Sequence, residues 1–373
     1  MTAAPERLRV PFLDLQELHA ELRPELDEAA LRVLHSDRVL LGPELDLFEE
    51  SWAAAVGARS AVGVGSGLDA LSLGLRALGV GAGDEVLVPS HTFVATWLAV
   101  LHVGAVPVPV DVRSANGDWD PAALEAAVTP RTRAVVPVHL YGQPVDLDPV
   151  LDVAGRHDLV VLDDAAQAHG ARLGDRPVGG LSHATAWSFY PGKNLGAFGD
   201  GGAVTTSDPA TARRLRSLRN YGSEVKYRHD EVGWNSRLDE LQAALLTVKL
   251  RRLAEHNARR EAAARRYDAG LAGLDLVLPE RTPGTTPVWH LYVVRSPHRD
   301  RLRAHLAGCG VETLVHYPVP PHRQPAFAGT GVAERHLPEA DRLSAEVLSL
   351  PMGPMLRPEQ QDAVIDAVRS FRP

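Results

Sequence analysis

Short apolar runs alternate with helical patterns from about residue 60 to residue 220, and few folds accommodate this alternation. The apolar runs read SAVGVGS, EVLVPS, AVPVPV, RAVVPVHLYG and LVVLDD, and the helical patterns between them include DALSLGLRALG and FVATWLAVLHVG. Strands that alternate with helices form parallel sheets through crossover connections. Strands that are apolar throughout are covered by helices on both faces. The sequence therefore predicts a large α/β domain built on a mostly parallel sheet.

The remaining third of the chain has a different pattern. Residues 235–271 follow a helical period, without proline and without glycine before Gly270, and we interpret them as a bridge between domains. A turn TPGTTP, a strand VWHLYVV, a helix RDRLRAHLAGCG, a short strand VETLVH and a final helix near Gln360 follow. We expect a large domain over residues 1–250, which includes an N-terminal segment, and a small α+β domain over residues 251–373.

Charge and composition exclude several classes of partner. The net charge of -8 gives no basic excess for nucleic acid or an anionic membrane. The single cysteine, Cys309, has no partner for an internal disulfide, and the opening MTAAPERLRVPF lacks the apolar core of a signal peptide. No apolar run approaches the roughly 20 residues that span a bilayer. We expect a cytoplasmic protein that acts on small molecules, with neither nucleic acid nor membrane as a partner.

One lysine stands out because this chain otherwise relies on arginine. Only Lys193, Lys226 and Lys249 occur, and Lys193 lies within SFYPGKNLGAFGDGGA. Lys249, in LLTVKLRRL, fits a solvated helix face on which arginine would serve equally well. Arginine cannot replace a lysine whose amine must bond to an aldehyde, because the guanidinium stays protonated. Lys193 is thus a candidate nucleophile, with a salt-bridging loop lysine as the alternative.

A glycine-bearing turn in VGVGSGLDAL is a candidate anion site. An expected strand ends within this stretch, and an expected helix begins after it. The residues at this junction are Gly63, Gly65, Ser66 and Gly67. Backbone N–H groups and the helix dipole at such a point favour a phosphate. The turn lacks the Gly-Lys-Ser/Thr of a P-loop, and Leu68 replaces the third glycine of a dinucleotide fingerprint. A purely structural turn is the alternative interpretation.

A second candidate group follows the strand in LVVLDDAAQAHGA. It contains Asp163, Asp164, Gln167 and His169, and ligands of open α/β sheets bind at the carboxyl ends of strands. An aspartate that caps the next helix and a buried histidine are the alternative interpretations. No second clustered histidine and no HExxH motif supports a metal, so we expect none.

Together these three groups fit one cofactor. Pyridoxal 5′-phosphate requires a lysine for its aldehyde, an acid for its pyridinium nitrogen and a helix N-terminus for its phosphate. Lys193, an aspartate of the DD pair and the turn at Ser66 and Gly67 offer these three groups.

Motifs along nearly the whole chain resemble those of the DegT/DnrJ/EryC1/StrS sugar aminotransferases. They are DALSLGLRALGVGAGDEVLVPSHTFVAT, VPVHLYGQPVDLDPVL, DDAAQAHGA, SFYPGKNLGAFGDGGA, RNYGS, GWNSRLDELQAALL and HYPVPPHRQPAF. The resemblance implies a fold type I homodimer, similar to aspartate aminotransferase. Its implied large domain has a mixed, mostly parallel sheet.

The resemblance also implies roles for individual residues. Lys193 would bond the cofactor aldehyde, Asp164 would face the pyridinium nitrogen, and Gln167 would reach the 3′-oxygen of the ring. The other implied cofactor contacts are Phe93 on the ring face, Ser66, Gly67 and Ser188 at the phosphate, and Asn235 reaching the phosphate from the other subunit. Tyr221, His316, Tyr317 and His322 would line the sugar side.

Two positions depart from the pattern of many family members. Leu68 replaces a threonine, which removes a hydroxyl contact to the phosphate, and Asp163 replaces a glutamate. Neither position carries the chemistry itself, and both would alter cofactor affinity.

The implied activity is transamination of a nucleotide-linked keto-deoxysugar with glutamate or glutamine as the amino donor. Among family members, the chain is most similar to those that aminate C-3 of a dTDP-3-keto-6-deoxyhexose, in pathways that make antibiotic amino sugars. Amination at C-4 of a dTDP-4-keto sugar is the close alternative. A sugar dehydratase is disfavoured because related dehydratases carry histidine in place of Lys193. A nicotinamide-dependent oxidoreductase is disfavoured by Leu68, and a non-catalytic sensor on the same fold is the remaining alternative.

Overall fold

A large sheet forms the centre of the computed structural model, which describes residues 8–113 and 117–373. Within these residues the sheet has seven strands in the order β1-β9-β8-β5-β4-β2-β3. Their bounds are β1 Ser60–Val64, β2 Glu85–Pro89, β3 Val106–Val110, β4 Thr132–Val135, β5 Val160–Asp164, β8 Ala184–Ser188 and β9 Gly202–Thr206. The five apolar runs of the sequence all became strands of this sheet.

The sheet is mixed and mostly parallel, as predicted. Strands β3, β2, β4, β5 and β8 pair in parallel, whereas β9 pairs antiparallel with both β8 and β1. Since β9 alone is reversed, β1 runs in the same direction as the parallel strands. Their carboxyl ends therefore meet at one edge of the sheet.

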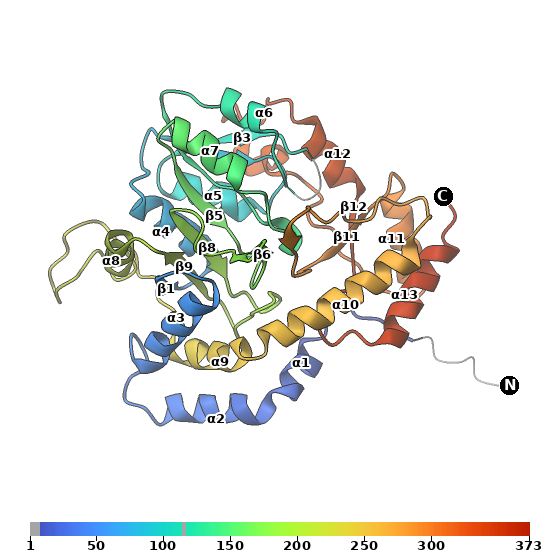
Figure 1. Ribbon diagram of the computed structural model, residues 1–373, viewed down its shortest axis with the longest axis horizontal. Helices are drawn as coiled ribbons and strands as arrows, with labels where there is room; N and C mark the ends of the chain where they lie inside the picture. Colours follow the sequence, from blue (N-terminus) through green and yellow to red (C-terminus); the bar gives the residue numbers. More distant parts are fainter. Residues whose placement is uncertain (1–7, 114–116) are drawn as a thin grey trace.

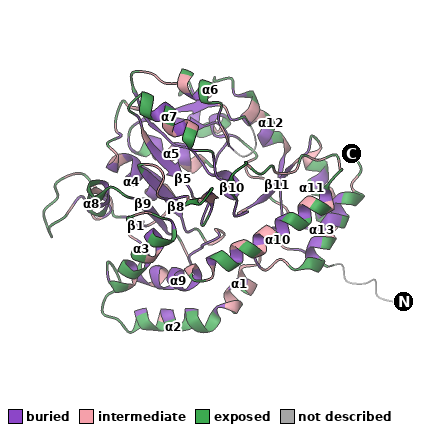
Figure 2. Ribbon diagram, viewed as in Figure 1, coloured by how far each residue is buried: buried purple, intermediate pink, exposed green. Residues whose placement is uncertain are grey.

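Helices cover both faces of the sheet (Figure 1). On one face, α4 (Gly67–Ala77), α5 (Val94–His102) and α8 (Pro209–Leu218) share a core with strand residues such as Val62 and Leu162. On the other face, α3 (Pro43–Ala55) and α9 (Glu240–Leu250) pack around Trp52 and Trp187. The strands are almost entirely buried (Figure 2), which is why they lack a polar alternation. Helices α2 (Arg23–Leu34), α6 (Pro121–Ala126) and α7 (Asp148–Arg156) complete this part of the molecule.

The segment expected to be one long helix over residues 235–271 is two helices. Helix α9 ends at Leu250, and α10 (Leu253–Leu271) begins after a break at Arg251 and Arg252. Residues 235–239 are not helical. From this break α10 extends toward the C-terminal helices (Figure 1), so α10 alone forms the bridge.

The C-terminal part is α+β, as predicted. Its elements are β11 (Tyr292–Arg295), α11 (Arg299–Gly308), α12 (Pro338–Glu346), β12 (Val347–Leu350) and α13 (Pro358–Ser370), with β11 and β12 antiparallel. The short strand expected in VETLVH forms only single bridges, from Val311 to Val10 and from Leu314 to Ser349. A small ribbon of β6 (Arg172–Leu173), β7 (Arg176–Pro177) and β10 (Thr285–Thr286) lies between the two parts.

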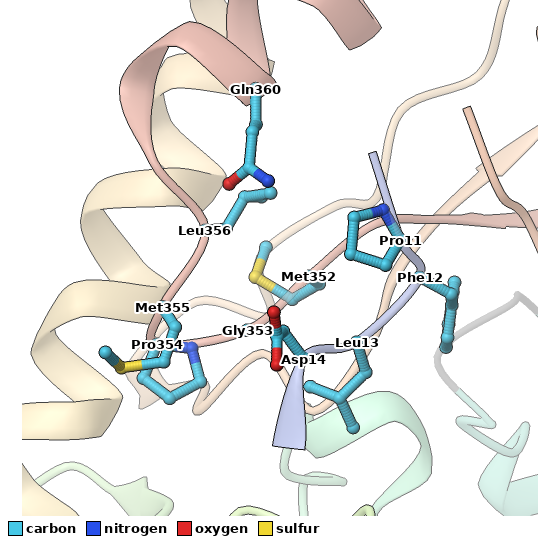
Figure 3. Close-up of a pocket in the computed structure, with 10 residues that line it drawn as sticks. All are labelled: Pro11, Phe12, Leu13, Asp14, Met352, Gly353, Pro354, Met355, Leu356 and Gln360. Carbon is cyan, nitrogen blue, oxygen red and sulfur yellow. The ribbon is translucent and has the colours of Figure 1, made fainter. Parts of the chain in front are cut away.

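The N-terminal segment crosses to the C-terminal part before α1 (Leu15–Glu21) begins. Val10 is fully buried in the same core cluster as Val311 and Leu348. A cleft lies between residues 11–14 and residues 352–356 (Figure 3). The division at residue 250 remains a prediction, and in this structure Val10 packs with residues C-terminal to it.

Candidate active site

The predicted site residues gather where the parallel strands end. Ser66 follows β1, Phe93 follows β2, Asp164 ends β5 and Ser188 ends β8. Four segments that are distant in sequence thus contribute side chains to one edge of the sheet, which is where open α/β sheets bind ligands. Lys193 lies five residues after Ser188, in a turn before β9.

Asp164 is a buried carboxylate with two fixed hydrogen bonds. The Thr96 hydroxyl donates to Asp164 Oδ2 (2.8 Å), and the Ala166 amide donates to Oδ1 (3.2 Å). Burial raises the pKa of Asp164 above its usual value, while these hydrogen bonds and the charge of Lys193 oppose the rise. A carboxyl group held in this way is suited to share a proton with a basic ring nitrogen.

Lys193 is half-buried beside this carboxylate. Its amide donates to the Tyr190 carbonyl (2.8 Å), which closes the turn that carries it. Desolvation lowers the pKa of the Lys193 amine from 10.5 to about 8, and Asp164 opposes the shift. A lysine amine with a lowered pKa is a better nucleophile at neutral pH.

The lowered pKa of Lys193 has a measurable consequence. Only the neutral amine attacks an aldehyde, so the neutral fraction grows as pH rises through about 8. We expect the association rate of the cofactor-free protein with pyridoxal 5′-phosphate to rise with pH and level off above about 8. Stopped-flow absorbance between pH 6 and 10 measures this rate. A rate that still rises tenfold per pH unit up to pH 10, as an amine with the ordinary lysine pKa of 10.5 would give, would contradict the expectation.

The turn at Ser66 and Gly67 opens α4, and the glycine at position 67 allows Ser188 to lie directly against the turn. Ser66 caps the helix, with its hydroxyl accepting from the Asp69 amide (3.1 Å). A Cβ on Gly67 would lie 2.5 Å from Ser188 Cβ, so the two segments are in van der Waals contact. Ser236 braces the turn from another segment, because its hydroxyl accepts from the Gly65 amide (2.9 Å) and donates to Asp69 (2.7 Å).

Gln167 connects the segment after β5 to the loop of Tyr317. Its Oε1 accepts from the Tyr141 amide (2.5 Å), and its Nε2 donates to the Tyr317 hydroxyl (3.1 Å). The Tyr317 ring lies 5.2 Å from the Phe93 ring, centroid to centroid. Phe93 is 51% exposed, although it is a large aromatic residue beside the site. Phe93, Gln167 and Tyr317 therefore line one side of the site.

The other residues predicted for the sugar side lie in different surroundings. His316 Nδ1 lies 2.8 Å from the Ser349 hydroxyl, and burial, with the charge of Lys193, lowers its pKa to about 4. Tyr221 is exposed and lies under the Arg237 guanidinium, 5.6 Å from ring centroid to Cζ. His322 is fully buried, with Nε2 3.2 Å from Asp341 on α12. His316 thus neighbours Lys193, whereas His322 faces α12.

Asn235 lies on the surface of the single chain. It is exposed and forms a bridge with Asn220, while its neighbour Ser236 is buried against Gly65. Asn235 therefore directly precedes a residue that contacts the turn at Gly65, yet its own side chain is exposed and open to a second chain.

His169 packs within an aromatic cluster. Its ring lies 5.5 Å from that of Trp187 and 5.7 Å from that of Trp52, and burial lowers its pKa to about 3. No group of three or more histidine, cysteine or acidic side chains within residues 8–113 and 117–373 is arranged to hold a metal ion. In the same part of the chain, no helix is long and apolar enough to cross a bilayer.

Three residues of the site were missed in the sequence. Thr96 binds Asp164 from the first turn of α5. Tyr141 reaches Gln167 through its amide and the His316 carbonyl through its hydroxyl. His290 neighbours Lys193, whose charge adds to burial in lowering the His290 pKa. The motifs SHTFVAT, HLYG and VWHLY contain them, but strand and helix patterns do not single out one side chain within a motif.

The interpretation of Lys249 as a solvated lysine was wrong. The residue is 6% exposed, and Nζ donates to the Gly196 carbonyl (2.7 Å) in the turn after Lys193. The helical period placed Lys249 on a face of α9, but the period does not reveal that α1 covers that face.

The residues fit pyridoxal 5′-phosphate in chemistry and in space. Lys193 would hold the aldehyde, buried Asp164 would receive the ring nitrogen, and the N-terminus of α4 at Ser66 and Gly67 would receive the phosphate. The fold and the site define a pyridoxal-phosphate-dependent transferase of fold type I.

The comparison with known families shows to which family of this class the chain belongs. The model of the DegT/DnrJ/EryC1/StrS aminotransferase family matches residues 20–369. The chain belongs to this family of aminotransferases, which confirms the family resemblance, the fold and the cofactor.

Individual relatives match over nearly the whole chain. A dTDP-3-amino-3,4,6-trideoxy-alpha-D-glucose transaminase of Streptomyces venezuelae is 55% identical over 100% of this chain and 98% of its own. The erythromycin biosynthesis sensory transduction protein EryC1 of Saccharopolyspora erythraea is 54% identical over 97% of this chain and 99% of its own. The crystal structure of S. venezuelae DesV in complex with a ketimine intermediate superposes with a TM-score of 0.95 at 56% identity, over 97% of this chain and 98% of that one.

Proposed function

We propose that this aminotransferase converts a dTDP-linked 3-keto-6-deoxyhexose to its 3-amino sugar, with glutamate or glutamine as the donor, in the biosynthesis of an antibiotic amino sugar. The observation that carries this proposal is the 55% identity, over the full chain, to a transaminase named for a dTDP-3-amino sugar. A second relative with that name, from Micromonospora megalomicea, is 47% identical over 93% of this chain. We place the reaction in the cytoplasm.

The residues of the site account for the chemistry of this reaction. When bound, pyridoxal 5′-phosphate supplies an electron sink for the carbanion formed at the reacting carbon. Lys193 Nζ takes the α-proton of the donor and later returns a proton to the sugar carbon, because its lowered pKa allows it to exchange protons near neutral pH. Asp164 keeps a proton on the ring nitrogen, and Thr96 holds the carboxylate in place.

The remaining predicted residues bind and orient. Ser66, Gly67 and Ser188 would bind the phosphate at the N-terminus of α4. Phe93 would stack on the ring, and Gln167 would donate to the 3′-oxygen. We assign the sugar to the side of Tyr317 and His316, which neighbour Gln167 and Lys193, together with Tyr221 and His322 as more distant contributors.

A two-step spectroscopic experiment tests the function. Purified protein should show a visible cofactor band that glutamate converts to the band of pyridoxamine 5′-phosphate. Addition of a dTDP-3-keto-6-deoxyhexose should restore the first band and release an amino sugar whose substituted carbon NMR identifies. A protein that stays colourless with added pyridoxal 5′-phosphate would refute the proposal.

The same experiment separates the alternatives. Amination of a dTDP-4-keto sugar in place of the 3-keto sugar would indicate a C-4 aminotransferase. A sugar product without nitrogen would indicate a dehydratase. Cofactor binding without turnover on any donor would indicate a sensor, a role suggested by the name of the relative EryC1.

We propose further that the enzyme is a homodimer with shared sites, in which Asn235 reaches the phosphate of the partner subunit. Asn235 is exposed in the single chain. Large apolar side chains are also exposed nearby in sequence, with Tyr227 85% and Val232 82% exposed. Exposed apolar residues in such density are typical of a surface that another protein covers.

Mixed dimers test the sharing of sites. A heterodimer of Lys193→Ala and Asn235→Ala subunits has one intact site if Asn235 serves its partner, and no intact site if it serves its own chain. We expect the heterodimer, isolated with two different tags, to retain cofactor at one site and to show about half the native activity per dimer. Activity no higher than that of the Asn235→Ala homodimer would contradict shared sites.

A further inference from the structure

Lys249 occupies an unusual position for a lysine, at the buried end of α9 against the turn that carries Lys193. Its Nζ donates to the Gly196 carbonyl (2.7 Å) and lies 3.1 Å from His19 Nε2 on α1. It also lies over the Phe198 ring, 4.5 Å from the centroid. A carbonyl, an imidazole nitrogen and an aromatic face are three acceptors, and an ammonium has three N–H donors for them.

The surroundings of Lys249 contain no compensating charge. Among residues 8–113 and 117–373, its amine forms no ion pair with a carboxylate, and burial lowers its pKa from 10.5 to about 8. Burial also lowers the pKa of His19 to about 4, with the charges of Lys249 and Arg23 adding to the effect, so the imidazole remains neutral and can accept. A buried cation of this kind is costly unless its N–H groups have acceptors, and here the Gly196 carbonyl, the His19 imidazole and the Phe198 ring provide them.

The Gly196 carbonyl belongs to the turn that carries Lys193, so a hydrogen bond to this carbonyl restrains the position of Lys193. A Cβ on Gly196 would lie 2.2 Å from the Pro191 carbonyl oxygen, so the two ends of the turn are in direct contact around Lys193. The turn is held from another direction at Asn194, whose side chain donates to the Val288 carbonyl (2.8 Å) and to Asn257 (2.9 Å). Lys249 thus connects the turn to α9, and Asn194 connects it to Asn257 on α10.

We propose that Lys249 is a positioning residue, which holds the turn of residues 190–197 through the Gly196 carbonyl and so sets the place of the Lys193 amine. This inference rests on the proposed role of Lys193 and extends it. Arginine is a poor substitute at this position, because its planar guanidinium cannot direct three N–H groups along the directions of an ammonium. That restriction gives a reason for lysine at position 249 in a chain that contains only three lysines.

A double-mutant cycle tests the proposal on the cofactor-free full-length protein. Dissociation constants for pyridoxal 5′-phosphate are measured by absorbance and fluorescence titration for Lys249→Met in the native and in the Lys193→Ala background. If Lys249 acts by placing the Lys193 amine, Lys249→Met should weaken binding about tenfold in the native background and less than twofold when Lys193 is absent. Arg251→Met, an exposed change near the same end of α9, is the matched control and should leave binding unchanged.

The outcomes separate this inference from the role of Lys193 itself. Equal losses in both backgrounds would mean that Lys249 only stabilises the fold, and no loss in either would remove its role; each result overturns the proposal. If Lys193→Ala alone leaves the affinity and the visible band unchanged, the assignment of Lys193 has failed instead. Thermal unfolding of each cofactor-free variant checks folding, and Lys249→Gln, which keeps a donor for Gly196, replaces Lys249→Met in the cycle if the latter does not fold. Lys249→Arg should recover affinity only in part.

Discussion

Replacement of Lys193 by alanine should lower kcat by on the order of 10⁴-fold or more, because the change removes both the bond to the cofactor aldehyde and the group that moves the proton. The lowered pKa of Lys193 and its place beside Asp164 are the structural basis for this expectation. The measurement is steady-state transamination, combined with a spectrum that should lack the band of lysine-bound cofactor.

Lys226 offers a matched control for the loss of an amine. It is exposed and lies 5.0 Å from the Tyr227 ring centroid, so Lys226→Ala should retain native turnover. Added methylamine should restore part of the activity of Lys193→Ala, since a small amine can take over proton transfer at a site that still folds. Near-native activity of Lys193→Ala without added amine would exclude Lys193 as the base.

The Asp164→Asn enzyme should lose about 10³-fold in kcat, because an amide cannot stabilise the protonated ring nitrogen. The change is nearly isosteric and can keep the hydrogen bond from Thr96, so the fold should survive. Steady-state kinetics measures the loss, and the unfolding temperature should remain close to the native value.

Asp163→Asn provides the comparison on the same strand. Asp163 is also fully buried, but it points to the other face of β5, where it accepts from the Ser182 hydroxyl (2.8 Å). Its loss should lower stability and leave kcat within a few-fold of native. Equal kinetic losses in the two variants would argue that burial of charge, and not contact with the cofactor, explains the effect at Asp164.

The parts of the fold that follow from local pattern could be predicted from the sequence. Apolar runs marked five strands of the large sheet, and Asp164 and Ser66 could be placed at strand ends because a run stops directly before them. Strands β8 and β9 escaped this reasoning, since ATAWS and GAVTT mix apolar residues with threonine, serine and glycine and are not apolar runs. The reversed direction of β9 depends on how that turn folds back, which no periodicity reveals.

Some residues of the site could also be predicted from the sequence, and others could not. Lys193 could be identified because only a lysine serves an aldehyde, and the aspartate and helix N-terminus follow from the needs of one cofactor. Lys249, Thr96 and Tyr141 act through contacts with segments far away in sequence; Lys249, for example, bonds Gly196 across a separation of 53 positions. Those contacts are set by packing between elements, so a single sequence shows the residues without their partners.

The burial of Val10 beside Val311 has a consequence for the order in which the protein is made. During synthesis Val10 leaves the ribosome long before its partner Val311, which is added 301 residues later. The large sheet can assemble in the meantime, since domains tend to fold as units while the chain grows. Val10 is therefore made early but is among the last residues to reach its native neighbours.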